Sequence, residues 1–265
     1  MVYDYEWFKS AVFQLTRIDL NAYKELQMKR RIDTLIARRG IDGYSAYVQV
    51  LKTDLARFEE FVNYLTINVS EFYRDPGQWQ LMEQKIIPEL VTKFGKNLKI
   101  WSAACSTGDE PYSLVMALSR YIPLGMIHVI ATDIDKQVIA KAKTGIYSEK
   151  SIAAVPADLK KRYFTKIGLS YQISDEIKKR VEFRTHNLLE GNYPKDFHMI
   201  VCRNVLIYFT EEAKDTVFRK FYQSLVPGGI FFTGATEQII NHKEIGYERK
   251  SSFYYERPGK KKVPL

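Results

Sequence analysis

The segment Leu98–Ser113 (LKIWSAACSTGDEPYS) constrains the fold more than any other part of the chain. It opens with an apolar run that is typical of a strand buried on both faces, and small residues then lead to Gly108. Asp109, Glu110 and Pro111 follow, and these residue types suit the first turn of a helix. A strand, a short loop and a helix in this order predict an α/β fold. In open α/β sheets such a loop is where a nucleotide-like ligand binds.

The loop also restricts the kind of ligand. It lacks the glycine-rich pattern of dinucleotide sites and the Gly-Lys-Ser/Thr of phosphate-binding loops. A single glycine with Glu110 close behind it suits a cationic ligand better than a pyrophosphate, and S-adenosylmethionine (SAM) carries a sulfonium and an amino group. An ordinary turn between a strand and a helix has the same local pattern, so the loop alone leaves both interpretations open.

Charge and cysteine content narrow the expected environment. The 265 residues have a formal net charge of +9, which favours an anionic partner such as nucleic acid, a membrane surface or an acidic protein. We find no apolar run that could span a bilayer and no signal peptide, and the 2 cysteines cannot build a disulfide framework. We therefore expect a cytoplasmic protein without direct membrane insertion. The 4 histidines lack metal-ligand spacing, and no metal is predicted.

The periodicity of apolar residues predicts two domains. Residues 1–75 show helical spacing and are expected to form an N-terminal helical domain. In residues 76–265, strand-like and helical segments alternate, which predicts a mostly parallel sheet covered by helices. Residues 146–180 interrupt this alternation and are interpreted as a small inserted subdomain, and Lys260–Lys262 begin an expected frayed tail.

The second predicted helix is strongly basic. Asn21 is its expected N-cap, and Gly40 is expected to end it. Its basic residues outnumber its acidic ones, and the basic residues singled out as docking candidates are Lys29, Arg30, Arg31 and Arg38. A solvated helix face and a docking surface for an acidic partner both explain this run.

Candidate ligand residues follow the predicted strands at their carboxyl ends. Asp133 ends the second strand at about the distance at which an acid binds ribose hydroxyls. The third and fourth strands are followed by residues of types that receive an adenine or line a ligand pocket: Asn187, Leu188, Arg203, Asn204 and Tyr208. The carboxyl ends of parallel strands share one edge of the sheet, so this edge is the predicted ligand site.

Five ordered motifs resemble those of the CheR family, the chemotaxis receptor glutamate O-methyltransferases that use SAM. They are NVSEFYRD (68–75), STGDEPYS (106–113), ATDID (131–135), RNVLIYF (203–209) and LVPGG (225–229). The resemblance covers nearly the whole chain. It implies a Rossmann-like class I SAM-methyltransferase sheet with an N-terminal all-α domain and an inserted antiparallel β-subdomain. It also implies SAM as cofactor and S-adenosylhomocysteine as product.

The same resemblance implies roles for individual residues. It surrounds the cofactor with Asn68, Ser70, Arg74, Glu110, Asp133, Asn187, Leu188, Arg203 and Asn204. Arg74 and Tyr208 are the implied catalytic residues, next to the transferred methyl group. Ser70 stands where the family has threonine and keeps the hydroxyl group.

The insertion departs from part of the family. Thr165–Ile177 is shorter and poorer in glycine than the hairpin with which some members bind a receptor pentapeptide. We therefore expect receptor docking to depend on the helical domain, through Lys29, Arg30, Arg31 and Arg38.

The implied reaction is transfer of a methyl group to glutamates in the cytoplasmic helical region of chemotaxis receptors, and a monomer suffices for it. An RNA methyltransferase would also explain the positive charge. However, the fourth strand ends in Arg203–Asn204 and lacks the Asn/Asp-Pro-Pro-aromatic loop of amino-methylating nucleic-acid enzymes, so no nucleic-acid partner is expected. A SAM-binding adaptor without turnover is the other alternative, and the presence of Arg74 and Tyr208 disfavours it.

Overall fold

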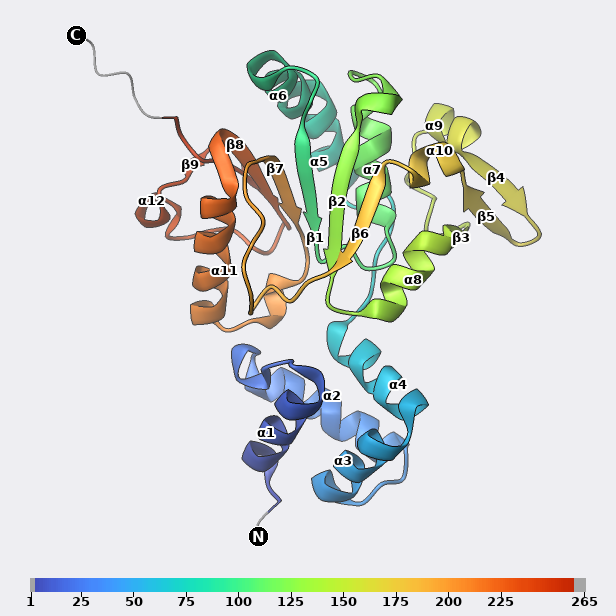
Figure 1. Cartoon of the computed structure of the whole chain (residues 1–265), viewed down its shortest axis with the longest axis vertical. Helices are drawn as coiled ribbons and strands as arrows, with labels where there is room; N and C mark the ends of the chain where they lie inside the picture. The colour runs from blue at the N-terminus through green and yellow to red at the C-terminus, as the bar shows by residue number, and fades with distance from the viewer. Residues whose placement is uncertain (1–2, 260–265) are drawn as a thin grey trace.

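The computed structural model describes residues 3–259, and a seven-stranded sheet organises most of them (Figure 1). The strand order is β6-β2-β1-β7-β8-β10-β9, in which β10 is antiparallel to β8 and β9 and the other pairs are parallel. The strands are β1 (Lys99–Ala103), β2 (His128–Asp133), β6 (Val181–Thr185), β7 (Phe197–Cys202), β8 (Leu225–Thr233), β9 (Glu248–Arg249) and β10 (Tyr254–Glu256). The predicted α/β class is confirmed, and the tail from Lys260 lies outside the described residues.

Both faces of the sheet are covered by helices. Met199 and Val201 of β7 point into one apolar core, and Ile200 and Cys202 point into the other, as alternation along a strand requires. The first core is covered by α5 (Pro76–Leu81), the π-helical turn η2 (Met82–Ile86), α6 (Ile87–Phe94) and α7 (Asp109–Leu118). The second core is covered by α11 (Glu211–Ser224) and α12 (His242–Ile245). A sheet buried on both faces explains the apolar strand at Leu98–Ala103.

The N-terminal helices form a separate layer with its own core. They are α1 (Tyr5–Thr16), the short turn η1 (Leu20–Ala22), α2 (Glu25–Arg38), α3 (Gly43–Thr53) and α4 (Leu55–Thr66). Phe8, Ile32 and Phe61 are completely buried between them. In Figure 1 this layer lies below the ends of β1 and β2 from which α7 and α8 (Lys136–Thr144) start. Every helix in the described part of the chain is too short or too polar to cross a bilayer.

The expected N-cap of the second helix was wrong. Asn21 lies inside η1, and α2 begins at Glu25 after Lys24, which makes no side-chain capping bond. Tyr23, which follows η1, is extended and pairs with Phe209 in an isolated antiparallel bridge. A contact distant in sequence thus delays the start of the helix.

The insertion contains a small antiparallel sheet in the order β3-β5-β4. Its elements are β3 (Ile146–Ser148), α9 (Ala157–Tyr163), β4 (Phe164–Ile167), β5 (Ser170–Ile173) and α10 (Asp175–Lys178). The ring of Phe72 packs edge-on against Tyr147 and Phe164, at centroid distances of 4.7 and 5.2 Å. The antiparallel subdomain is confirmed, and it supports the segment that connects α4 to α5.

Asp135 ties the end of α4 to the loop between β2 and α8. The side chains of Asn63, Thr66 and Asn68 all donate to its Oδ2, over 3.1, 3.3 and 2.8 Å. Its Oδ1 accepts from the backbone N–H of Gln137 over 2.8 Å. This buried carboxylate therefore fixes the helical layer against the sheet.

Replacement of Asp135 by Ala leaves these donors without their shared acceptor. We expect the free energy of unfolding to fall by about 1–3 kcal/mol, the cost of buried donors left unsatisfied. Urea titration monitored by circular dichroism measures this change. Asp175 is exposed and pairs with Lys178 of its own short helix, so it provides the control, and Asp175→Ala should change stability far less. Equal stability of the two variants would contradict the assignment.

Candidate active site

A pocket opens where the carboxyl ends of β1, β2, β6 and β7 face the helical layer. We call it the main pocket, and its walls include Asn68, Asp133, Asn187, Leu188 and Tyr208. An inner hollow adjoins it, and its walls include Ser70, Arg74 and Glu110. Arg203 and Asn204 line both. The structure thus brings together every residue predicted around the cofactor and both predicted catalytic residues.

The loop between β1 and α7 is sharply wound. Ala104, Ser106 and Gly108 have φ values of 62°, 48° and 89°, in the left-handed region. A Cβ atom on Gly108 would lie only 2.9 Å from Cβ of Ala142 in α8. The glycine is therefore required for the close packing of α8, while Ser106 and Ala104 line the main pocket. Non-glycine residues held at positive φ are frequent at functional sites.

Asp133 joins this loop to the next one. Its Oδ2 accepts from the backbone N–H of Ser106 over 2.8 Å, and its Oδ1 accepts from that of Asp135 over 3.0 Å. Burial raises the pKa of Asp133 to about 6, although these hydrogen bonds favour the ionised form. Two backbone N–H groups thus hold the carboxylate in the wall of the main pocket.

Glu110 lies in the first turn of α7 and faces the inner hollow. Ser102 donates its hydroxyl hydrogen to Oε1 of Glu110 over 2.7 Å. Burial raises the pKa of Glu110 to about 7, and the nearby Arg203 guanidinium opposes this shift. Its neighbour Asp109 is also buried but serves the fold, because its carboxylate accepts from Thr107 and Ser151.

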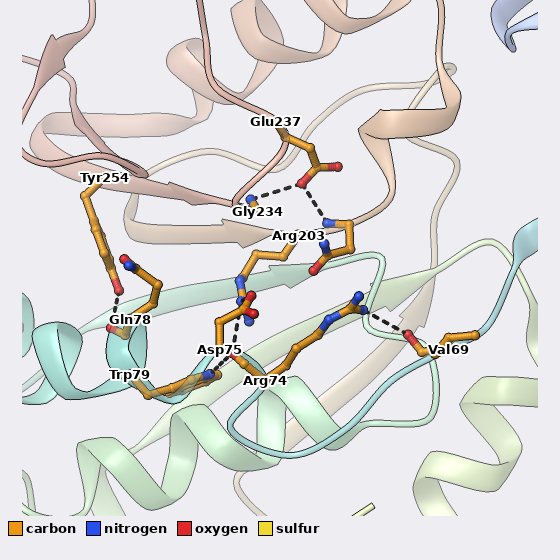
Figure 2. A network of polar contacts seen from close by, with 10 residues as sticks. Val69, Arg74, Asp75, Gln78, Trp79, Arg203, Gly234, Glu237 and Tyr254 are labelled. Carbon is orange, nitrogen blue, oxygen red and sulfur yellow. Dashed lines mark hydrogen bonds and ion pairs between the residues drawn. The ribbon is translucent and has the colours of Figure 1, made fainter. Parts of the chain in front are cut away.

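Arg203 connects the two segments that carry the predicted catalytic residues. Its Nη2 donates to the backbone oxygen of Arg74 over 3.0 Å and forms an ion pair with Asp75 (Figure 2). Its guanidinium also stacks 4.8 Å from the ring centre of Phe232. The Arg74 side chain is half-buried and points along the same segment toward the backbone oxygen of Val69 (Figure 2).

Asn187, in the wall of the main pocket, contacts the N-terminal helical layer. The Asn187 amide donates to the backbone oxygen of Arg17 over 3.1 Å and accepts from the N–H of Leu189 over 3.0 Å. The side chain of Leu188 is buried and presents an apolar surface to the main pocket. An apolar wall beside fixed polar groups suits a planar base such as adenine.

Sequence reasoning missed two aromatic residues of the pocket wall, Tyr23 from the helical layer and Phe209 from the segment after β7. Both line the main pocket, and their rings meet edge to face at a centroid distance of 5.0 Å. Two backbone hydrogen bonds flank this bridge, from Lys24 N–H to the oxygen of Tyr208 over 2.9 Å and from Thr210 N–H to that of Ala22 over 2.8 Å. The sequence carries no local signal for this pairing, because it joins segments far apart in the chain.

The basic residues of α2 fall into two groups. Arg30 and Arg31 line a basic hollow, together with Lys24, Gln27, Met28 and Tyr208. Lys29 lies elsewhere, since its ammonium pairs with Asp33 over 2.9 Å and stacks on the rings of Tyr5 and Tyr44. Arg38, in the last turn of α2, is exposed and does not line the basic hollow. Tyr208 is thus shared by the basic hollow and the main pocket.

Unsatisfied polar atoms in the pocket walls suit an adenosyl ligand. Ser106 Oγ, His186 Nε2 and Asn204 Oδ1 are buried and have no hydrogen-bond partner within residues 3–259. Native proteins rarely leave such atoms unpaired, so a ligand is expected to complete them. Together with the carboxylates of Asp133 and Glu110, they match the hydroxyl, amino and base groups of SAM.

Comparison with known proteins agrees with this geometry. The family described as "CheR methyltransferase, SAM binding domain" matches residues 68–254, and "CheR methyltransferase, all-alpha domain" matches residues 3–66. A "Chemotaxis protein methyltransferase" of Listeria innocua is 38% identical over 252 residues, which cover 95% of this chain and 96% of that protein. "Chemotaxis protein methyltransferase 1" of Pseudomonas aeruginosa is 33% identical over 249 residues, covering 90% of this chain and 91% of that protein. The chain therefore belongs to the CheR family and is a SAM-dependent methyltransferase of the chemotaxis type.

Proposed function

We propose that this enzyme methylates glutamate side-chain carboxylates of chemotaxis receptors and forms glutamate methyl esters. The observation that supports this best is the position of Tyr208, which lines both the main pocket and the basic hollow. A receptor helix that carries glutamates would bind the cations of α2, and one of its carboxylates would then reach the main pocket beside Tyr208. We infer that a single chain acts in the cytoplasm, on the helical region of the receptor.

The cofactor pocket would bind SAM through groups of opposite charge and matching shape. Glu110 would receive the amino group, Asp133 the ribose hydroxyls, and Asn187 and Leu188 the adenine. Asn68, Ser70, Arg203 and Asn204 would complete the walls around the methionine and ribose portions. When bound, SAM supplies a methyl group on a positively charged sulfur.

The chain needs no general base for this reaction. A free glutamate has a pKa of about 4.3, so the acceptor is already ionised at neutral pH. The enzyme must therefore align the carboxylate with the donor methyl and exclude water. Tyr208 would hold the carboxylate by donating its hydroxyl hydrogen, and Arg74 would hold the carboxylate of the substrate or of the cofactor. Charge disappears as the new bond forms, which a partly dehydrated pocket favours.

The raised pKa of Glu110 predicts pH-dependent cofactor binding. The carboxyl group titrates at about 7 in the free protein, and only its ionised form attracts an ammonium group. We expect the affinity for S-adenosylhomocysteine to fall as the pH drops below 7, and Glu110→Gln to lose this dependence. Isothermal titration calorimetry measures both. Because Asp133 titrates at about 6, the comparison is made above that pH. The same pH dependence in both proteins would refute the role of Glu110.

Substitution of the two predicted catalytic residues, Tyr208 and Arg74, should reduce methyl transfer. We expect Tyr208→Phe to lower methyl transfer about 10²-fold, the lower end of the range for loss of one oriented hydrogen-bond donor. We expect Arg74→Ala to remove most activity. Each protein is incubated with labelled SAM and receptor-bearing membranes, and the membranes are then treated with base. Base-labile label on the receptor identifies a methyl ester. Transfer to RNA, or binding of SAM without any transfer, would instead support the two alternative functions.

If the basic hollow is the docking surface, reversing its charge should weaken docking to the receptor. Charge reversal in the double variant Arg30→Glu/Arg31→Glu should reduce receptor methylation and its salt dependence, while the affinity for S-adenosylhomocysteine stays unchanged. Lys85→Glu/Lys96→Glu makes the same change in net charge at exposed positions of η2 and the turn after α6. Neither lysine lines the basic hollow, and α6 lies far from α2 in Figure 1, so this double variant should methylate normally. Equal receptor methylation by both double variants would rule out this docking surface.

A further inference from the structure

Glu237 is a buried carboxylate outside the machinery described so far. It lies in the segment that follows β8 and is only 3% exposed. It does not line the main pocket or the inner hollow. Burial raises its pKa, while its hydrogen bonds to the backbone favour the ionised form. Burying a carboxylate is costly unless its oxygens are well paired, so its contacts indicate its purpose.

Both carboxylate oxygens accept hydrogen bonds from backbone N–H groups. Oε2 accepts from Asn204 over 2.6 Å and from Gly234 over 3.0 Å, and Oε1 accepts from Ile207 over 3.2 Å. Figure 2 shows the Glu237 carboxylate between Gly234 and the segment that follows Arg203. Two of the three donors therefore belong to the segment after β7.

That segment carries the residues proposed to act in the site. Asn204 has a φ of 60°, in the left-handed region, which asparagine tolerates better than most residues with a side chain and which contacts from the surroundings stabilise. Ile207 lies in the short 3-10 turn η4 (Leu206–Tyr208), one residue before Tyr208. Arg203, at the start of the segment, holds the backbone of Arg74. Because Glu237 binds the N–H groups of both Asn204 and Ile207, it holds this segment at two points along its length.

We propose that Glu237 is a positioning residue. It does not touch the cofactor, but it holds Asn204 and Tyr208 in the geometry that cofactor binding and methyl transfer need. The part that concerns Asn204 depends only on the SAM pocket. The part that concerns Tyr208 rests on the function proposed above.

The contacts explain why a carboxylate is needed here. A glutamine of the same length offers one oxygen, and its amide nitrogen would face either Ile207 N–H or the N–H groups of Asn204 and Gly234. Gly234 is constrained by the same group, because a Cβ atom there would lie 2.3 Å from Oε2 of Glu237 and 2.9 Å from the nitrogen of Asn204. Gly234→Ala should therefore displace the carboxylate, and press on the Asn204 backbone that it holds, without changing any charge.

The test compares Glu237→Gln and Gly234→Ala with the wild-type protein by calorimetry with S-adenosylhomocysteine. Each variant should bind about tenfold more weakly, because a displaced Asn204 would lose the equivalent of about one hydrogen bond to the cofactor. In receptor methylation the KM for SAM should rise and kcat should fall, whereas a merely structural defect would lower the active fraction and leave KM unchanged.

Glu256→Gln is the matched control. Glu256 is also buried at 8% exposure, but it pairs with Lys93 and Lys250, and it does not line either pocket. We expect this variant to melt at a lower temperature and to bind S-adenosylhomocysteine normally. If Glu237→Gln does not fold, Gly234→Ala decides by the same measurement.

Normal affinity and normal KM in a folded Glu237→Gln or Gly234→Ala variant would overturn the proposal. The binding measurement needs no receptor. A wild-type protein that failed to methylate receptors would therefore refute the proposed function and leave this test of Glu237 intact.

Discussion

Buried carboxylates that accept hydrogen bonds from loop backbones hold the site together. Loops at a sheet edge cannot satisfy their own N–H groups by regular pairing, so other groups must accept these hydrogen bonds. Asp133 accepts from the two loops after β1 and β2, and Glu237 accepts from the segment after β7. Asp135 accepts from the side chains of Asn63 and Thr66 in α4 and of Asn68 just after it. Each carboxylate loses hydration on burial, and the fixed donors around it offset that cost.

The pocket is formed by two layers of the protein together. The sheet supplies Asp133 and the residues after β7, while the helical layer supplies Tyr23 and, at its end, Asn68. The same helical layer carries Arg30 and Arg31, which line the basic hollow next to Tyr208. The main pocket and the basic hollow therefore meet at one side chain, Tyr208, and neither layer would form the complete pocket alone.

Much of the fold and many site residues could be predicted because their signals are local. The buried strand before Gly108, the acids in the first turn of α7 and the acid that ends β2 are readable from neighbouring residues, and parallel pairing then brings the strand ends together. The ordered family motifs added residues that no local pattern identifies, such as Ser70 and Arg74. The structure places them in the walls of the inner hollow.

The missed features depend on contacts between distant segments. Asn21 has the chemistry of an N-cap, but the pairing of Tyr23 with Phe209 keeps the chain extended and moves the helix start to Glu25. Lys29 looks like its basic neighbours in the sequence, yet Asp33 and Tyr44 engage it within the helical layer. Glu237 is an unremarkable acid in sequence, since its partners are backbone groups that any residues provide.

The bridge between Tyr23 and Phe209 has a consequence for how such enzymes diversify. The hydrogen bonds that flank it use only main-chain atoms, on one side at the entry to α2 and on the other at Tyr208 and Thr210. Main-chain pairing does not depend on which side chains are present. The side chains on the outward face of α2 can therefore change over evolution while the main-chain connection of this helix to Tyr208 is kept.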